Sequence, residues 1–208
     1  MPEKVYSEGY FTGILDIMVA LMKTPDGPKT KPTYDPFEAL GKTIEATITP
    51  VYKEGKVYAS NVATRNEKRI DGYTLSLNLD KIPYEKREKA LGRAKDANGV
   101  HIIKGTQVAP NLAVLFALTL DDGSKELWVL YKGKFVEPTQ VGHTDSDSMT
   151  YQHPTLEGNF VRREYDDALA AVAATADKSV SEEVATRWFG EVYEADEADE
   201  ETPEPVDP

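Results

Sequence analysis

The 208-residue chain contains no cysteine, which excludes a disulfide-stabilised fold and any chemistry that depends on a thiol. It also lacks a long hydrophobic run near its start. The apolar stretch at 14–22 is short, contains Asp16 and follows no basic segment, so we interpret it as neither a signal peptide nor a membrane span. These absences are typical of a protein that folds in a reducing cytoplasm.

Basic residues are few relative to acidic ones. The chain has 24 Lys and Arg against 36 Asp and Glu, for a net charge of −12. The stretch 191–208 holds nine of the acids and no base, so the remainder has a net charge of only −3. An acidic, proline-containing segment with little apolar content cannot offset its ordering entropy. We therefore predict one domain over 1–193 and a disordered acidic tail over 194–208.

Two stretches alternate between apolar and polar side chains, as expected of strands with one buried and one solvated face. In 43–49, Ile44, Ala46 and Ile48 form the apolar set, and in 73–80 the apolar set is Tyr73 and three leucines. The predicted solvated faces carry no Lys or Arg and consist of Thr43, Glu45, Thr47, Thr49, Thr74, Ser76, Asn78 and Asp80.

The segment 50–71 joins these two strands. It is too long for a tight hairpin and ends in a polar run of low β propensity, so it is predicted to be an extended, protruding loop. Between 50 and 69 it has a net charge of +3, set by Glu54 and Glu67 against Lys53, Lys56, Arg65, Lys68 and Arg69. This contrast with an otherwise acidic chain indicates a contact surface for a partner of opposite charge.

Further elements follow from the same patterns. A first strand is predicted at 10–22, a proline-rich loop at 23–36, and a short helix at 83–92 with Pro83 at its start and Gly92 as its cap. The apolar stretch 112–120 is predicted to be a strand buried on both faces and paired with 126–136. We expect a further strand at 159–167, and a short helix or alanine-rich linker at 166–177. A closing helix is expected after a capping box at 179–182, with an apolar stripe of Val180, Val184, Trp188 and Val192.

One polar stretch, "VGHTDSDSMTYQHPTLEG" at 141–158, suggests chemistry. His143, Asp145 and Asp147 alternate, so a strand would place them on one face with His153 nearby, as a metal-binding module or hydrolase requires. The residues between them are also polar, which is the pattern of a solvent-exposed strand entry. No nucleophile elbow, phosphate loop or HExxH helix is present. We therefore predict surface residues, no cofactor and no enzymatic activity, with the metal site as the alternative.

The order of these pieces resembles a known family. The segments that carry the resemblance are "GILDIMVALM", "LGKTIEATITPVYKEGKVYASN", "DGYTLSLNLDKIPYEKREKALG", "PNLAVLFALTLDDGSKELWVLYKGKFVEP", "TDSDSMTYQHPTLEG" and "VATRWFGEVYE". Together they span nearly all of 9–193, and they are similar to the major tail proteins, or tail-tube proteins, of phages with long non-contractile tails.

The resemblance implies a mainly β fold with short helices: a β-sandwich with a flanking helix and a C-terminal helix, which closes into a ring barrel when six copies assemble. Stacked hexameric rings would form the conduit for genome ejection, built in the host cytoplasm and carried in the virion tail. Implied partners are other copies of the chain, the tape measure, tail terminator and distal tail proteins, and double-stranded DNA that passes without specific binding. No membrane is implied.

The resemblance also assigns roles to the two residue sets. The loop at 50–71 matches the inter-ring connection, and the cation-free faces would line the lumen, because DNA binds rows of cations. A tail terminator or a secretion-system tube protein is the alternative within this class of ring-forming proteins.

Overall fold

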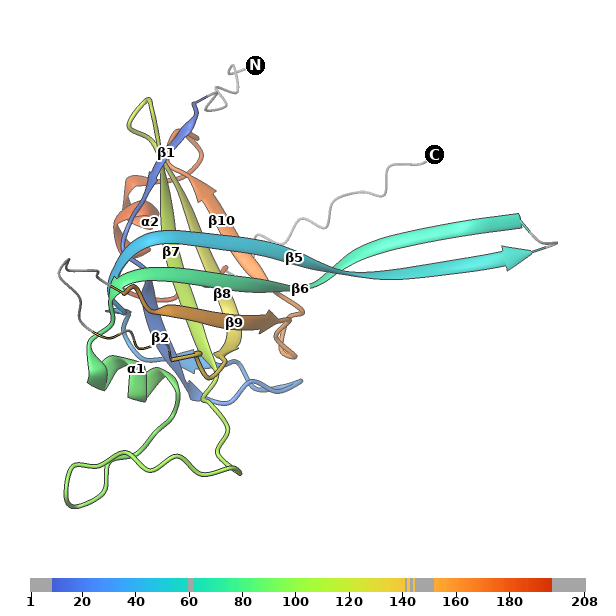
Figure 1. Ribbon diagram of the computed structural model, residues 1–208. Coiled ribbons are helices and arrows are strands. Elements are labelled where there is room, and N and C mark those ends of the chain that lie inside the picture. Colours follow the sequence, from blue (N-terminus) through green and yellow to red (C-terminus); the bar gives the residue numbers. More distant parts are fainter. Residues whose placement is uncertain (1–8, 60–61, 141, 143, 145–151, 196–208) are drawn as a thin grey trace.

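The computed structural model describes residues 9–59, 62–140, 142, 144 and 152–195; the side chains of 56–66 are also outside the description. Within these residues the protein is mainly β, with two short helices, which confirms the predicted fold class (Figure 1). The strands are β1 Phe11–Ile14, β2 Met18–Thr24, β3 Thr33–Tyr34, β4 Glu38–Ala39, β5 Lys42–Ala59, β6 Val62–Lys81, β7 Leu112–Leu120, β8 Lys125–Phe135, β9 Thr155–Val161 and β10 Ala170–Ala174. The helices are α1 Tyr84–Ala90 and α2 Glu182–Arg187, and neither is long and apolar enough to cross a membrane.

The strands form one antiparallel sheet in the order β3-β2-β7-β8-β9-β6-β5. Three strands lie off this path: β1 pairs with β7, β10 with β8 and β4 with β2. The part formed by β5, β6 and β9 crosses over the part formed by β7 and β8, so the core lies between them (Figure 1).

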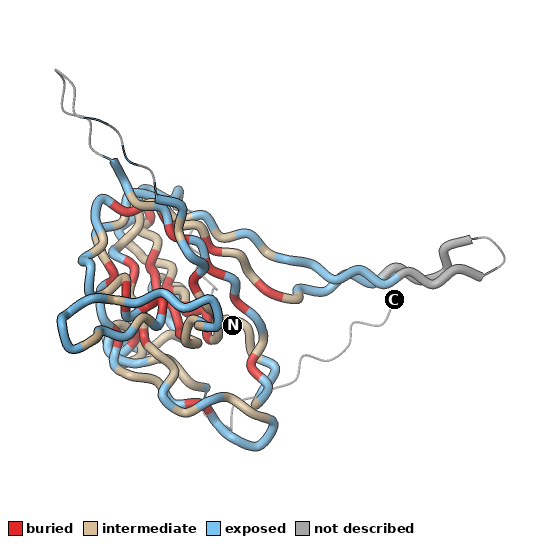
Figure 2. Tube along the Cα trace, turned by 60° about the horizontal axis from the view of Figure 1, so that its bottom comes forward, coloured by how far each residue is buried: buried red, intermediate tan, exposed pale blue. Residues whose placement is uncertain are grey.

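Strand β7 is buried on both faces, as its apolar sequence predicts. Leu112, Val114 and Phe116 face a cluster that includes the leucines of β6. The alternate residues Ala113 and Leu115 face a second cluster, which is closed by residues of α2 and the segment after it. In the other layer, buried positions alternate along β9 and the second half of β6, and the buried positions gather in the body of the molecule in Figure 2. The two clusters together account for the sandwich-like packing.

The sheet turns from one layer to the other between β8 and β9, where only Gly133–Phe135 pair with Gly158–Phe160. The Phe160 ring lies directly against Gly133, and a Cβ atom there would overlap the ring. A side chain at Gly133 would therefore displace the ring from the core.

The segment 50–71 is not a loop: β5 and β6 continue through it as a two-stranded hairpin that projects from the body (Figure 1). The register pairs Val51 with Gly72 and continues to Ala59 and Val62. The predicted protrusion is present, but its backbone hydrogen bonds are those of a β-ribbon. The low β propensity of its charged run is overridden by pairing across the hairpin.

Other elements also differ from the predictions. The first strand is two strands, because the segment between Ile14 and Met18 leaves the sheet. The alanine-rich segment is strand β10, paired with β8 from Ala170 to Ala174, and the strand predicted at 159–167 is β9, which ends at Val161. The N-cap of α2 is Ser181 rather than Ser179, because the Ser181 Oγ accepts a hydrogen bond from the Val184 N–H at 3.2 Å.

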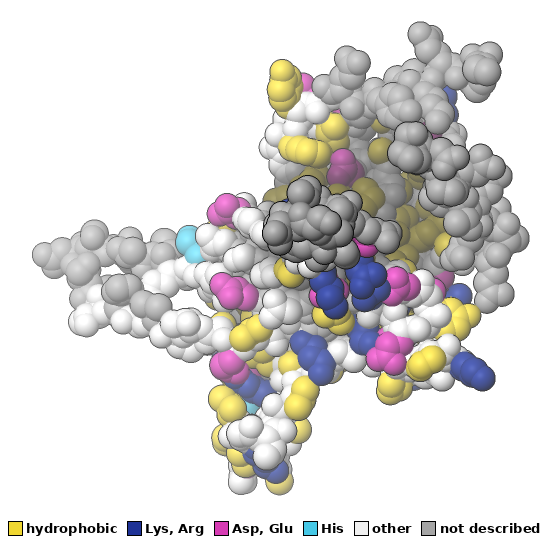
Figure 3. Space-filling view, turned by 90° about the vertical axis from the view of Figure 1, so that its right-hand side faces the viewer, with side chains coloured by type: hydrophobic (Ala, Val, Ile, Leu, Met, Phe, Trp, Pro, Cys, Tyr) yellow, Lys and Arg dark blue, Asp and Glu magenta, His cyan; other side chains and the backbone are white. Residues whose placement is uncertain are grey.

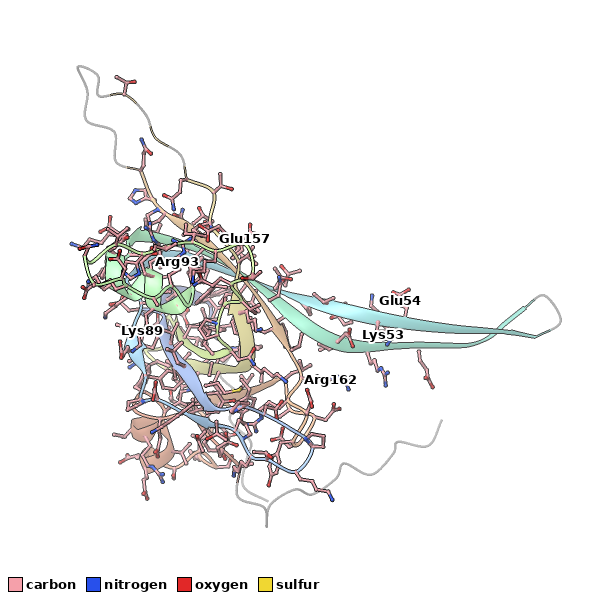
Figure 4. All side chains as sticks on the ribbon, turned by 90° about the horizontal axis from the view of Figure 1, so that it is seen from below. Lys53, Glu54, Lys89, Arg93, Glu157 and Arg162 are labelled. Atoms are coloured by element: carbon pink, nitrogen blue, oxygen red, sulfur yellow. The ribbon has the colours of Figure 1, made fainter. Side chains whose placement is uncertain are left out.

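Helix α1 agrees with the sequence analysis. Pro83 is its N-cap, and Gly92 follows its end with a φ of 72°, a left-handed conformation that suits glycine. The buried carboxylate of Glu88 accepts hydrogen bonds from Arg87 and from Arg93, which lies next to α1 in Figure 4. These hydrogen bonds hold the pKa of Glu88 below its usual range against the opposing effect of burial. The ion pairs fix the helix to the loop that follows it.

Candidate functional site

A polar face covers β5, β6 and β9 on the side away from the core. The register places Thr47 opposite Ser76 and Thr49 opposite Thr74. The three leucines between the polar residues of β6 are fully buried, so the predicted alternation there is correct. Including the positions that β9 contributes, the face consists of Glu45, Thr47, Thr49, Thr74, Ser76, Asn78, Thr155, Glu157 and Asn159. None of these residues is a Lys or Arg.

Strand β9 is the part of this face that the sequence analysis missed. Its exposed residues Thr155, Glu157 and Asn159 alternate with buried ones, and the Thr74 Oγ1 lies 3.4 Å from the Asn159 Oδ1. The alternation in "TLEGNFV" was the signal that could have revealed it. The face ends at β8, where Lys134 pairs with Asn159 and brings in a cation.

Two predicted members of the face differ in position. A bulge between Thr43 and Glu45 pairs Thr43 with Leu79 and leaves Ile44 exposed, so the predicted alternation is wrong at these two residues. The Thr43 Oγ1 instead accepts a hydrogen bond from the Ile17 N–H at 3.0 Å. Asp80 is exposed at the end of the face, and its Oδ1 lies 3.7 Å from the His153 Nδ1.

The hairpin carries its charges on two sides. Glu54 and Lys68 are cross-strand neighbours and form an ion pair at 3.3 Å, with the Lys68 Nζ 4.3 Å from the centre of the Tyr52 ring. Lys53 and Arg69 are the adjacent pair in the register and therefore lie on the other side. Figure 4 shows Lys53 and Glu54 on opposite sides of the ribbon.

Two of the five predicted contact cations, Lys56 and Arg65, lie in the strands of the hairpin, but their side chains are outside the described residues. Nearer the body, Val51, Tyr52 and Ile70 are exposed apolar residues. The root of the hairpin therefore presents apolar and charged groups together. Viewed along the hairpin, basic and acidic side chains lie side by side just below it (Figure 3).

An ionic network fastens the C-terminal segment next to this root. The buried Arg163 donates a hydrogen bond to the Glu194 carboxylate at 2.6 Å, pairs with Asp166, and lies 3.9 Å from the centre of the Tyr131 ring. Burial opposes the charge of Arg163, but these hydrogen bonds raise its pKa well above the usual value. The preceding residue, Arg162, approaches Asp71 of the hairpin root at 3.8 Å.

The proline-rich loop is anchored by Asp26, whose side chain is fully buried. Its carboxylate accepts hydrogen bonds from the Glu164 N–H at 2.6 Å, the Tyr165 N–H at 3.1 Å and the Lys132 Nζ at 2.7 Å. Burial alone would raise the pKa of Asp26, but these donors outweigh it and hold the pKa below the usual value. The loop is thus joined to β8 and to the segment after β9.

The alternative metal site falls largely outside the described residues, which do not include His143, Asp145 or Asp147. His153 is described, and Asp80 is the acidic residue that it faces. Across the described part of the chain, no three His, Cys, Asp or Glu side chains are grouped so that they could hold a metal ion.

A sequence model of the phage tail tube protein family matches residues 19–194, which covers both layers of the sheet, the hairpin and α2. The chain belongs to the phage tail tube protein family. It is thus a structural tail protein, in agreement with the resemblance found in the sequence.

Among solved structures, the chain is similar to a protein of the anti-feeding prophage cap, described as a tube terminating cap, at 10% identity and a TM-score of 0.42. It is also similar to a protein of the anti-feeding prophage baseplate, at 13% identity and a TM-score of 0.31. Each similarity covers 83% of this chain and 97% of the other. No curated protein of similar sequence was found.

Proposed function

We propose that the protein is the major subunit of the tail tube of a phage with a non-contractile tail, that six copies form a ring, and that stacked rings form the conduit for genome ejection. The family match over residues 19–194 is the observation that carries this proposal. The protein would assemble in the host cytoplasm with tape measure, terminator and distal tail proteins and remain in the virion tail. It has a geometric and electrostatic role rather than a catalytic one.

The strand order supports ring closure. Strand β5 is at one end of the sheet, so within the described residues no strand is hydrogen-bonded to its outer edge. An open edge is a template for pairing with another chain, and closing a ring of subunits covers it. Ile44, Val51 and Ile70 lie exposed on β5 and β6 and would be buried by the same contact.

The polar face supports the role of a lumen. A duplex carries one negative charge per ~1.7 Å of axis and binds rows of cations. A wall of hydroxyl, amide and carboxylate groups lacks such rows and lets the duplex slide. We assign the lumen to the polar face of β5, β6 and β9, and the inter-ring contact to the hairpin, where Lys53, Lys68 and Arg69 meet an acidic neighbouring ring.

The register defines a clean test of the hairpin. Because Glu54 pairs with Lys68, replacing 55–67 by Asn-Gly leaves a short hairpin closed by a favourable two-residue turn. We expect stacked rings or hollow tubes of the intact protein in negative-stain electron microscopy, and single rings or free subunits of the shortened protein.

A matched control variant replaces Gly55 by Ala, because a Cβ there meets no atom within 4 Å. It should assemble like the intact chain. Tubes of normal length from the shortened chain would show that rings stack without the hairpin, and would contradict its role in the inter-ring contact. A single ring from the intact chain at every concentration would favour a tail terminator instead.

A further inference from the structure

Lys53 and Arg69 form a pair of like charges on the hairpin. They are direct cross-strand neighbours in an antiparallel ribbon, a placement that is destabilising for like charges. Neither side chain has an ion-pair partner among the residues that the structure describes, whereas Glu54 and Lys68 on the other side satisfy each other. The nearest acidic residue along β6, Glu67, has an interaction of its own. This side of the hairpin therefore carries Lys53 and Arg69 next to the single carboxylate of Glu67, a net charge of +1 among the described side chains.

The last described residues are tied to the chain segment that follows β9, which adjoins the base of the hairpin. The buried Arg163 donates a hydrogen bond to the Glu194 carboxylate. Arg162, which precedes Arg163 in the chain, lies 3.8 Å from the Asp71 carboxylate. Asp71 is two residues from Arg69 in β6. Figure 4 shows Arg162 on the same side of the hairpin as Lys53. Neighbouring residues of one segment, Arg162 and Arg163, thus contact the hairpin base and Glu194 respectively.

The residues that follow have the complementary charge. The stretch 196–207 contains seven Asp and Glu and no basic residue. An extended chain spans at most about 3.5 Å per residue, so this stretch reaches roughly 40 Å from its anchor. Attachment through so short a linker gives an effective concentration on the order of millimolar, which favours the hairpin of the same chain over that of another copy.

We propose that the acidic segment 196–207 binds to the side of its own hairpin that carries Lys53 and Arg69. The guanidinium of Arg69 binds one carboxylate in a two-pronged arrangement, and the ammonium of Lys53 pairs with a second. The contact is solvent-exposed, so it is weak and sensitive to salt. It is a property of the free subunit and does not rest on the proposed tube.

The first experiment compares backbone amide resonances of 196–207 by nuclear magnetic resonance in three full-length proteins: the wild type, the double variant Lys53→Gln with Arg69→Gln, and a control, Lys104→Gln with Lys178→Gln. Both variants lose two positive charges, and the control residues are exposed in the segments before β7 and after β10, outside the hairpin. In the wild type and the control, the resonances should move on raising salt to about 1 M, where the Debye length is about 3 Å. In the hairpin variant they should already lie at the high-salt positions. Identical tail resonances in all three proteins would overturn the proposal.

A second experiment identifies the chain that is bound. Carbodiimide joins amines to carboxylates that are in direct contact, and mass spectrometry of a mixture of ¹⁴N and ¹⁵N protein separates links within a chain from links between chains. We expect Lys53 to be linked to carboxylates of 196–207 of the same chain. If cross-links form only between chains, the segment does not bind the hairpin of its own chain. If cross-links are spread evenly over the exposed lysines, the segment has no specific site at Lys53 and Arg69.

Discussion

At the scale of single residues, the loss of the Asp26 carboxylate should destabilise the fold, because it anchors the proline-rich loop. Its buried carboxylate satisfies two backbone N–H groups and Lys132. Replacing it by Asn removes an acceptor and the negative charge, and leaves Lys132 with only the more exposed carboxylate of Glu164, 3.5 Å from its Nζ. We expect Asp26→Asn to lower the free energy of unfolding by about 1–3 kcal/mol at neutral pH, measured by urea denaturation.

The pH dependence of this difference follows from the direction of the pKa shift. The pKa of Asp26 is lower in the folded state than the usual value of about 3.9, so its contribution is complete above that pH and is lost as the pH falls through the folded-state pKa. The difference in unfolding free energy between wild type and Asp26→Asn should therefore become smaller below about pH 4. Asp35→Asn, in the same loop, is the control and should show no such gap. A gap that persists unchanged in acid would contradict the ionic role of Asp26.

At the scale of elements, α2 depends on its cap and its docking, because a helix of six residues is not stable alone. Trp188 at its end is buried and stacks on Tyr193 with ring centres 4.9 Å apart. Removing the cap in Ser181→Ala should cost about 1 kcal/mol, measured by denaturation followed through tryptophan fluorescence. Ser179→Ala is the matched control, since its hydroxyl binds Asp177 instead. A larger loss of unfolding free energy for Ser179→Ala than for Ser181→Ala would mean that Ser179 is the N-cap, as the capping box at 179–182 predicts.

The elements predicted correctly are those in which burial dictates a regular pattern of apolar residues along the sequence. Strand β7 has apolar residues on both faces, and β6 alternates around Leu75, Leu77 and Leu79, so sequence and structure agree there. Strand β10 was missed because alanine has low β propensity and this segment is a strand only through its pairing with Leu130 and its neighbours on β8.

The candidate site was predictable to the same extent. The polar positions of β6 follow from alternation alone. The bulge at Ile44 is a local change of register that a strict period of two cannot show, and it moved Thr43 away from the face. The hairpin was recognised as a protrusion with a charge contrast. Its strand pairing was not, because the side chains of 51–55 and 67–70 are exposed and no apolar period marks the segment.

At the scale of the whole molecule, the proposed lumen makes a prediction about DNA. Thr47 is exposed in the middle of the polar face, so Thr47→Lys would add one cation per subunit and a ring of cations in the assembled tube. Tubes of this variant should retain double-stranded DNA that wild-type tubes release, measured by co-sedimentation over a range of salt concentrations. The logarithm of the binding constant should fall with the logarithm of salt by about 0.9 for each phosphate that the added lysines neutralise.

The control for this experiment is Thr106→Lys, which adds the same charge at an exposed position in the segment between α1 and β7, outside the polar face. On the proposed geometry it changes DNA retention much less, because cations outside the lumen do not face the enclosed duplex. Equal retention by the two variants would mean that the polar face does not meet DNA. The cation-free wall would then have to be assigned to a contact between subunits, where an uncharged polar surface on β5 and β6 has a different use: hydrogen bonding across the closed ring.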